Sequence, residues 1–181
     1  MPDHFGSQAD RSRYFEKAIW PHLTAAYNFA RWIVRDHHDA EDVVQESLVK
    51  AFRSAETFRG TDVRPWLLAI VRNCAMDLIG RHKKNEQVQM DELPEAADSR
   101  PNPEISLVQE RRRETVRTAI GRLPLEFRDA LLLREMESMS YKEIAFVLKV
   151  PLGTVMSRLS RARALLVNEL ITQQETSHDV L

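Results

Sequence analysis

The sequence predicts an all-α protein made of two small helical domains joined by a flexible acidic linker. Only 5 of the 181 residues are glycine, and long stretches repeat apolar side chains at the spacing of one helix face. No stretch alternates apolar and polar residues as a half-buried strand does. The composition, with 43% hydrophobic and 29% charged residues, is typical of a globular protein.

The linker is expected at residues 85–106, which contain three prolines, six acidic residues and one arginine. A net charge of −5 without apolar periodicity is typical of a segment that has no packed core. The linker separates an N-terminal domain, 1–84, from a C-terminal domain, 107–171, and a polar tail follows at 172–181. Residues 1–84 and 107–181 each carry a net charge of only +2, which is weak for a protein that holds DNA unaided. DNA binding would therefore need a larger partner.

The N-terminal domain is expected to begin with residues 13–34, as one helix or a pair of helices around Pro21. The charged stretch DHHD then interrupts the apolar pattern. Asp39, at its end, can cap the next helix, with Asp42 three residues on. Apolar residues at 40–52 fall on one face, which predicts an amphipathic helix.

A loop around Gly60 and a further helix at 66–79 complete the N-terminal domain. Gly80 is expected to end that helix, because glycine readily takes the left-handed conformation that follows many helix C-termini. Cys74, the single cysteine, lies in the apolar part of this helix and is expected to be buried rather than reactive.

The C-terminal domain is expected to hold helices at 107–120 and 126–137, followed by a helix-turn-helix. Ser140 and Glu143 have the spacing of a capping box, which marks the start of a short helix. After a tight turn, Pro151 suits the first position of the second helix, where its missing N–H costs nothing.

The second helix of this pair has one apolar and one polar face. The apolar residues recur at the spacing of a core stripe, at Val155, Leu159, Ala162 and Leu166. The outward side carries Thr154, Ser157, Arg158 and Arg161, with Arg163 beside them. Arginine can bond guanine bidentately and serine can bond base edges or phosphate, so this face suits a DNA major groove. The alternative is a solvated basic face on an ordinary helical hairpin.

The stretch SYKEIAFVLKVPLGTVMSRLSRARALL, residues 140–166, resembles the promoter-reading helix-turn-helix of bacterial sigma factors of the extracytoplasmic-function (ECF) type. The resemblance implies contacts with the minus-35 promoter element from Thr154, Met156, Ser157, Arg158, Ser160, Arg161 and Arg163. Met156 departs from the family, which often has lysine or arginine at this position. Its side chain either covers the edge of the core or packs on a thymine methyl group, a contact that lysine could not reproduce.

The stretch DAEDVVQESLVKAFRS, residues 39–54, resembles the sigma-factor helix that docks on a coiled coil of the largest polymerase subunit. The positions matched to that contact are Asp42, Gln45 and Glu46. Short acidic and amide side chains on a rigid helix can pair with arginines of a partner and set the register of the interface. Without the resemblance, such a face would be expected only to aid solubility.

The stretch FRGTDVRPWLLAIVRNCAMDLIGRHKK, residues 58–84, resembles the part of the family that melts the promoter and recognises the minus-ten element. The resemblance implies a pocket for an extruded base, formed by Lys50, Ser54, Phe58 and Asn73. It also implies phosphate contacts from Arg59, Arg72 and Arg81. Such a pocket compensates for the stacking that is lost when a duplex opens. Trp66 is expected in the core, with a stacking surface as the alternative.

Taken together, the resemblances imply an initiation subunit of bacterial RNA polymerase. The N-terminal domain would bind core polymerase and open the minus-ten element. The C-terminal domain would dock on the polymerase flap, and the linker would follow the RNA exit path. An anti-sigma factor is implied as a further partner. Catalysis would belong to the polymerase, so the chain is not expected to be an enzyme.

No cofactor or metal is expected. His37 and His38 are adjacent and lack the i, i+4 spacing of a helical metal pair. The longest apolar run, 66–71, is too short to span a membrane, and the first residues lack the apolar core of a signal peptide. With a single cysteine, these features favour a cytoplasmic protein without membrane contact.

Two other classes of protein remain open. A stand-alone helix-turn-helix regulator needs a dimerisation surface, but no heptad pattern provides one, so we expect a monomer. An interaction protein that sequesters a regulator without touching DNA would not need the arginines of the second helix.

Overall fold

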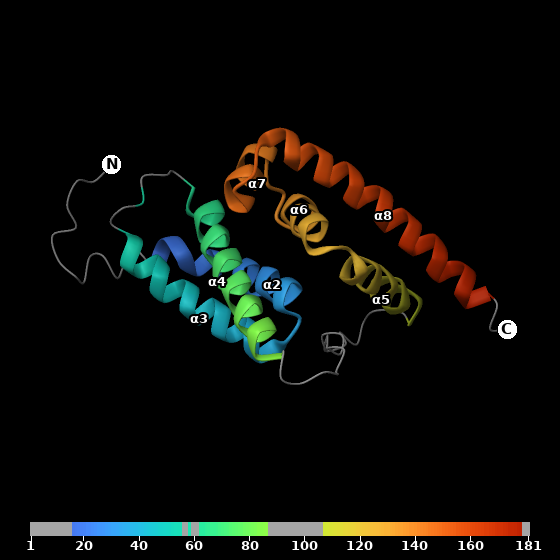
Figure 1. Ribbon diagram of the computed structural model, residues 1–181, viewed down its shortest axis with the longest axis horizontal. Helices are drawn as coiled ribbons and strands as arrows, with labels where there is room; N and C mark the ends of the chain where they lie inside the picture. Colours follow the sequence, from blue (N-terminus) through green and yellow to red (C-terminus); the bar gives the residue numbers. More distant parts are fainter. Residues whose placement is uncertain (1–15, 56–57, 59–61, 87–106, 179–181) are drawn as a thin grey trace. The chain divides into compact units, whose positions relative to one another are not determined.

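All regular secondary structure of the computed structural model is helical (Figure 1). The residues that it describes are 16–55, 58, 62–86 and 107–178. Among these residues no strand occurs, which confirms the all-α prediction. The chain divides into two compact units, Met1–Pro94 and Glu95–Leu181. Most of the expected linker, residues 87–106, lies outside the described residues.

In the described part of the N-terminal unit, α2 (Leu23–Val34), α3 (His37–Ser54) and α4 (Val63–Glu86) pack against one another in pairs. Before them, residues 16–19 are helical and the 3-10 turn η1 (Trp20–His22) carries Pro21. Of the two expected arrangements, the structure therefore has a helical segment on either side of Pro21 and not one continuous α-helix. The buried core side chains include Phe29, Ile33, Val43, Leu67, Val71 and Cys74. The predicted burial of the cysteine is therefore confirmed.

The start of α3 differs from the prediction, because Asp36 rather than Asp39 caps the helix. Arg35 takes the left-handed conformation, with φ of 66°, after α2, and Asp36 is extended. The Asp36 carboxylate accepts a hydrogen bond of 2.9 Å from the backbone N–H of Asp39. This hydrogen bond lowers the pKa of Asp36, whereas burial raises the pKa of Asp39 inside the first turn.

The predicted end of α4 at Gly80 is wrong, since the helix continues to Glu86. Two side chains beyond the glycine reach α3. Arg81 lies 3.5 Å from Glu46, and His82 lies 3.5 Å from Asp39. We infer that these contacts between helices outweigh the weak helical propensity of one glycine.

The C-terminal unit contains α5 (Leu107–Arg122), α6 (Leu125–Glu135), α7 (Tyr141–Leu148) and α8 (Leu152–His178). α8 packs against each of the other three helices. The largest buried side chains include Leu133, Met139, Ile144, Val147, Val155 and Leu159. Arg128 and Asp129 of α6 are also buried, and Arg128 donates a hydrogen bond of 2.9 Å to the carbonyl of Gly121.

The helix-turn-helix is formed by α7 and α8, as predicted. The Ser140 hydroxyl accepts the backbone N–H of Glu143, and the Glu143 carboxylate accepts the backbone N–H of Ser140, which confirms the capping box. Lys149 ends α7 in the left-handed conformation. Pro151 is not the first helical residue, which corrects the prediction. It precedes α8, and its carbonyl accepts the N–H of Val155 at 3.2 Å.

Candidate nucleic-acid interface

α8 presents an exposed face that holds most of the predicted minus-35 residues. On the opposite side Val155, Leu159 and Ala162 are buried, which confirms the core stripe, and Leu166 packs partly buried beside them. The exposed side chains are Met156, Ser157, Ser160, Arg161 and Arg163, while Thr154 is half-buried. Residues 150–166 contain three arginines and no acidic residue, so the positive charge of this face comes from Arg158, Arg161 and Arg163.

Two of the predicted DNA-binding arginines are held by acidic residues of α6. The Arg158 guanidinium lies 3.2 Å from the Glu126 carboxylate, and its side chain is only 19% exposed. The expectation that Arg158 points outward is therefore wrong, because the residue leans onto α6. Arg163 lies 2.9 Å from Glu135, and this hydrogen bond raises the pKa of the Arg163 guanidinium.

Met156 is 49% exposed, so part of its side chain is available to a partner, and both interpretations of its role stay predictions. Leu152, one turn earlier on the same side of α8, is also exposed, as is Phe146 of α7. Neither residue was predicted from the sequence to lie at the DNA interface. The i, i+4 spacing of Leu152 and Met156 is the signal that could have identified the first of them.

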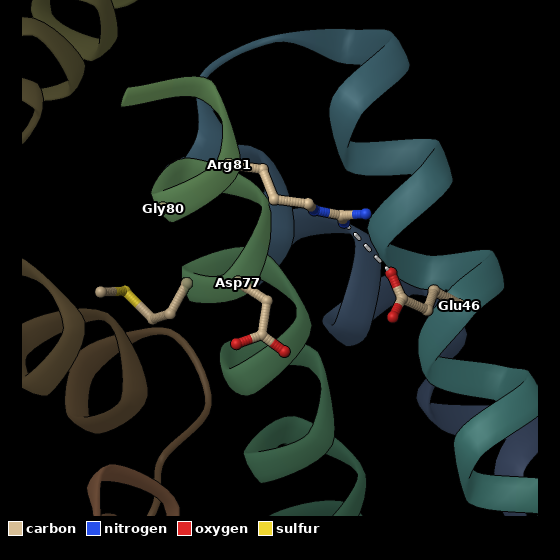
Figure 2. A pocket seen from close by; sticks show the side chains of 5 residues that line it. Glu46, Asp77, Gly80 and Arg81 are labelled. Carbon is tan, nitrogen blue, oxygen red and sulfur yellow. Dashed lines mark ion pairs between the residues drawn. The ribbon is translucent and has the colours of Figure 1, made fainter. Parts of the chain in front are cut away.

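The predicted polymerase-binding residues lie along α3. Asp42 and Gln45 are exposed to solvent, whereas Glu46 is half-buried because it reaches α4. Figure 2 shows the Glu46 carboxylate facing the guanidinium of Arg81 across the gap between the two helices.

Glu46 joins two of the predicted minus-ten residues in one ion-pair network. One carboxylate oxygen lies 2.8 Å from Lys50 Nζ, and the other lies 3.5 Å from Arg81. The hydrogen bond between Glu46 and Lys50 lowers the pKa of the carboxyl and raises the pKa of the ammonium. Residues predicted to bind polymerase and residues predicted to bind DNA are therefore connected in the free chain.

The surface beside this network is hollowed, and the hollow is lined by Glu46, Met76, Asp77, Gly80 and Arg81 (Figure 2). Asp77 is a neighbour of the site that sequence analysis missed. Its carboxylate lies 3.8 Å from Lys50 Nζ. It also stands one helical turn after Asn73 and one turn before Arg81, a spacing that could have indicated it.

The residues predicted to hold an extruded minus-ten base come from the end of α3, from Phe58 and from α4. Ser54 Oγ donates a hydrogen bond of 2.6 Å to the carbonyl of Lys50. The rings of Phe58 and Trp66 lie 4.7 Å apart at 35°, and Trp66 is only partly buried. Arg72 and Asn73 are half-buried on α4. Arg59 lies outside the described residues.

Two family models match the chain, one in each unit. Residues 20–85 match Sigma-70 region 2, and residues 113–166 match Sigma-70, region 4. The RNA polymerase sigma-H factor of Pseudomonas aeruginosa is 37% identical over 139 residues, 72% of each chain. The ECF RNA polymerase sigma-E factor of Salmonella typhimurium is 37% identical over 141 residues, which are 73% of this chain and 74% of the relative. The chain belongs to the ECF family of RNA polymerase sigma factors.

This ECF sigma factor is also similar to the following proteins. The ECF RNA polymerase sigma factor SigE of Mycolicibacterium smegmatis is 34% identical over 165 residues, which are 89% of this chain but only 63% of the relative. The sigma factor RpoE of Bartonella quintana, solved with the anti-sigma factor NepR, is 28% identical with a TM-score of 0.76 over 87% of this chain and 97% of that one. CnrH, solved with the cytosolic domain of CnrY, shares the fold with a TM-score of 0.62.

Membership of the ECF family sets aside the stand-alone helix-turn-helix regulator. The predicted site residues 42–81 lie within the region 2 match, and residues 154–163 lie within the region 4 match. The individual contacts of these residues with polymerase and DNA stay predictions.

None of the described helices combines the length and apolarity needed to cross a membrane. Nor do the described residues bring three His, Cys, Asp or Glu side chains together as a metal site. His37 shares a hydrogen bond of 2.7 Å with the Tyr27 hydroxyl and lies 3.3 Å from Glu41.

Proposed function

We propose that this ECF sigma factor is a promoter-specific initiation subunit that directs bacterial RNA polymerase to promoters and melts them. The observation that carries the proposal is that one chain has two exposed surfaces, each of which suits a different kind of partner. The exposed acidic and amide face of α3 suits a basic protein partner, and the exposed basic face of α8 suits DNA. These surfaces lie in the separate parts of the chain that match region 2 and region 4.

Within this function, residues 1–84 bind core polymerase through Asp42, Gln45 and Glu46 and open the minus-ten element. Residues 107–171 dock on the polymerase flap and recognise the minus-35 element. The acidic stretch 85–106 connects them through the RNA exit path, where its net charge of −5 suits a basic channel. The whole chain has a net charge of −1, so the polymerase supplies the non-specific affinity for DNA and performs the catalysis.

An anti-sigma factor is the further partner in this proposal. The support is the likeness to RpoE of Bartonella quintana, which was solved with the anti-sigma factor NepR. We expect the free chain to be monomeric and cytoplasmic, and to associate with either the inhibitor or the polymerase.

The decisive experiment is transcription in vitro with core polymerase on a promoter library. The chain should direct initiation from promoters that share minus-ten and minus-35 motifs. Arg161→Ala, at an exposed position of α8, should reduce this transcription, and Arg112→Ala, an exposed arginine of α5, is the matched control. Tight sequence-specific DNA binding by the free chain, without polymerase-dependent transcription, would contradict the proposal.

A further inference from the structure

Several polar side chains predicted to contact the minus-35 element already have partners within the C-terminal unit. Arg158 is paired with Glu126, and Arg163 is paired with Glu135. The Ser157 hydroxyl donates a hydrogen bond of 3.0 Å to the backbone of its own helix. Part of the expected polar recognition is therefore engaged before DNA arrives, and the remaining exposed groups gain importance.

Two of those exposed groups are apolar. Leu152 is 38% exposed and Met156 is 49% exposed, although both lie on a helix whose other face supplies the core. They are four residues apart, so they lie on the same side of α8, separated by about 6 Å along its axis. Ser160 continues the same side one turn later, and Arg161 is exposed beside it.

The position of this apolar pair favours nucleic acid as its occupant. The pair lies at the start of the second helix of the helix-turn-helix, near the exposed Arg161 and within the match to Sigma-70, region 4. Residues at the N-terminal end of a recognition helix are the ones that contact base edges in the major groove. Among the groups that base pairs present there, the thymine methyl is the apolar one. Leu152 and Met156 are about 6 Å apart along the helix, and successive base pairs are about 3.4 Å apart along DNA. The two side chains can therefore reach neighbouring base pairs.

We propose that Leu152 and Met156 form an apolar pair that recognises the methyl groups of thymines at neighbouring base pairs of the minus-35 element. This inference rests on the proposed function and adds the base that α8 prefers in the minus-35 element. Each side chain covers a thymine methyl group and so removes it from water. The pair therefore distinguishes thymine from any base that lacks this methyl group. A lysine or arginine at position 156 would instead favour hydrogen-bond acceptors such as those of guanine.

The test uses the holoenzyme and the promoter that a library selects. Each thymine of the minus-35 element, on either strand, is replaced singly by uracil, which removes the methyl and keeps every hydrogen-bonding group. We expect promoter affinity to fall about fourfold at each of two neighbouring positions, the effect of one buried methyl-sized group. In Met156→Ala the uracil effect should vanish at one of these positions, and in Leu152→Ala at the other.

The matched control is Val167→Ala, which removes an exposed apolar side chain from α8 well beyond its N-terminal turns. This variant should keep the full sensitivity to uracil. The inference is overturned if uracil has no effect at any position, if Met156→Ala keeps the same sensitivity, or if Val167→Ala loses it too. A holoenzyme that transcribes normally from uracil-containing promoters contradicts only this inference, whereas a chain that supports no transcription contradicts the proposed function.

Discussion

The carboxylate of Glu46 on α3 lies 3.5 Å from the guanidinium of Arg81 on α4, and the same carboxylate lies 2.8 Å from Lys50. Glu46 is predicted to bind polymerase, while Arg81 and Lys50 are predicted to bind minus-ten DNA. In the free chain the single negative charge of Glu46 offsets part of the positive charge of the two cations. Polymerase that engages Glu46 would therefore leave more positive charge available for DNA.

We expect Glu46→Gln to tighten the binding of minus-ten single-stranded DNA by the free chain about two- to fivefold, because exposed ion pairs contribute only about 0–1 kcal/mol each. The same variant should bind core polymerase more weakly. Fluorescence anisotropy with a labelled oligonucleotide at low salt measures the first effect, and titration with core polymerase measures the second.

Asp42→Asn is the matched control for this variant, since it removes one negative charge from an exposed position of the same helix. It should weaken polymerase binding too, but its effect on free-chain DNA binding should be smaller. If the two variants change DNA affinity equally, the effect comes from net charge, and Glu46 does not restrain Lys50 and Arg81.

Asp36→Ala should lower the free energy of unfolding by about 1 kcal/mol at neutral pH, because α3 loses its N-terminal cap. Asp36→Asn should keep most of the stability, since asparagine caps well. Urea unfolding followed by circular dichroism measures both. A destabilisation of Asp36→Asn as large as that of Asp36→Ala would show that the side-chain oxygen is not the capping group.

The contribution of Asp36 should also depend on pH. The hydrogen bond from the backbone of Asp39 lowers the pKa of Asp36 below 3.8 in the folded chain. The added stability of the carboxylate is therefore complete above the unfolded pKa and is lost as the pH falls through the lowered folded pKa. We expect the advantage of wild type over Asp36→Asn to shrink in that acidic range. Burial raises the pKa of Asp39, which gives stability the opposite dependence on pH. Because both chains contain Asp39, comparing them cancels much of this second effect.

The helix-turn-helix could be predicted closely because its signals are local. The capping box of Ser140 and Glu143 and the core stripe of Val155 and Leu159 depend only on residues within a few turns. The N-cap of α3 could not be predicted from such local signals. Asp36 and Asp39 both have the side chain of an N-cap, and the left-handed Arg35 before Asp36 decides between them.

Other features depend on partners distant in sequence. Arg158 points toward α6 because Glu126, 32 residues away, accepts its hydrogen bond. α4 continues past Gly80 into residues that pair with α3, which a glycine-based rule for helix ends does not include. Periodicity within one helix identifies a polar face, but it does not show which polar groups on that face are already engaged.

Gly80→Ala should raise the free energy of unfolding by about 0.5–1 kcal/mol, because alanine restricts the unfolded chain more than glycine does. Gly80 lies inside α4 without positive φ, and an added Cβ would meet no atom within 4 Å. Gly80→Pro should instead destabilise the unit by about 3 kcal/mol or more. A loss of stability in Gly80→Ala, measured by chemical denaturation, would indicate that the helix ends at the glycine after all.

Arg158 and Arg161 differ in their surroundings, and their alanine variants should differ accordingly. Arg161→Ala should lower promoter affinity about 5- to 150-fold with an unchanged melting temperature, because the residue is exposed and a specific arginine contact is worth about 1–3 kcal/mol. Arg158→Ala should lower the stability of the C-terminal unit, by at most about 1 kcal/mol, because its ion pair joins α8 to α6.

Glu126→Ala separates the two roles of Arg158, since it breaks the same ion pair and leaves the arginine in place. If Arg158 acts by holding α8 on α6, both variants lose similar stability and similar promoter affinity. If Arg158 instead contacts DNA directly, Arg158→Ala loses affinity while Glu126→Ala, which releases the guanidinium and removes a negative charge near the DNA, binds the promoter at least as well as wild type. Thermal melts and holoenzyme binding to one minus-35 promoter decide between these outcomes.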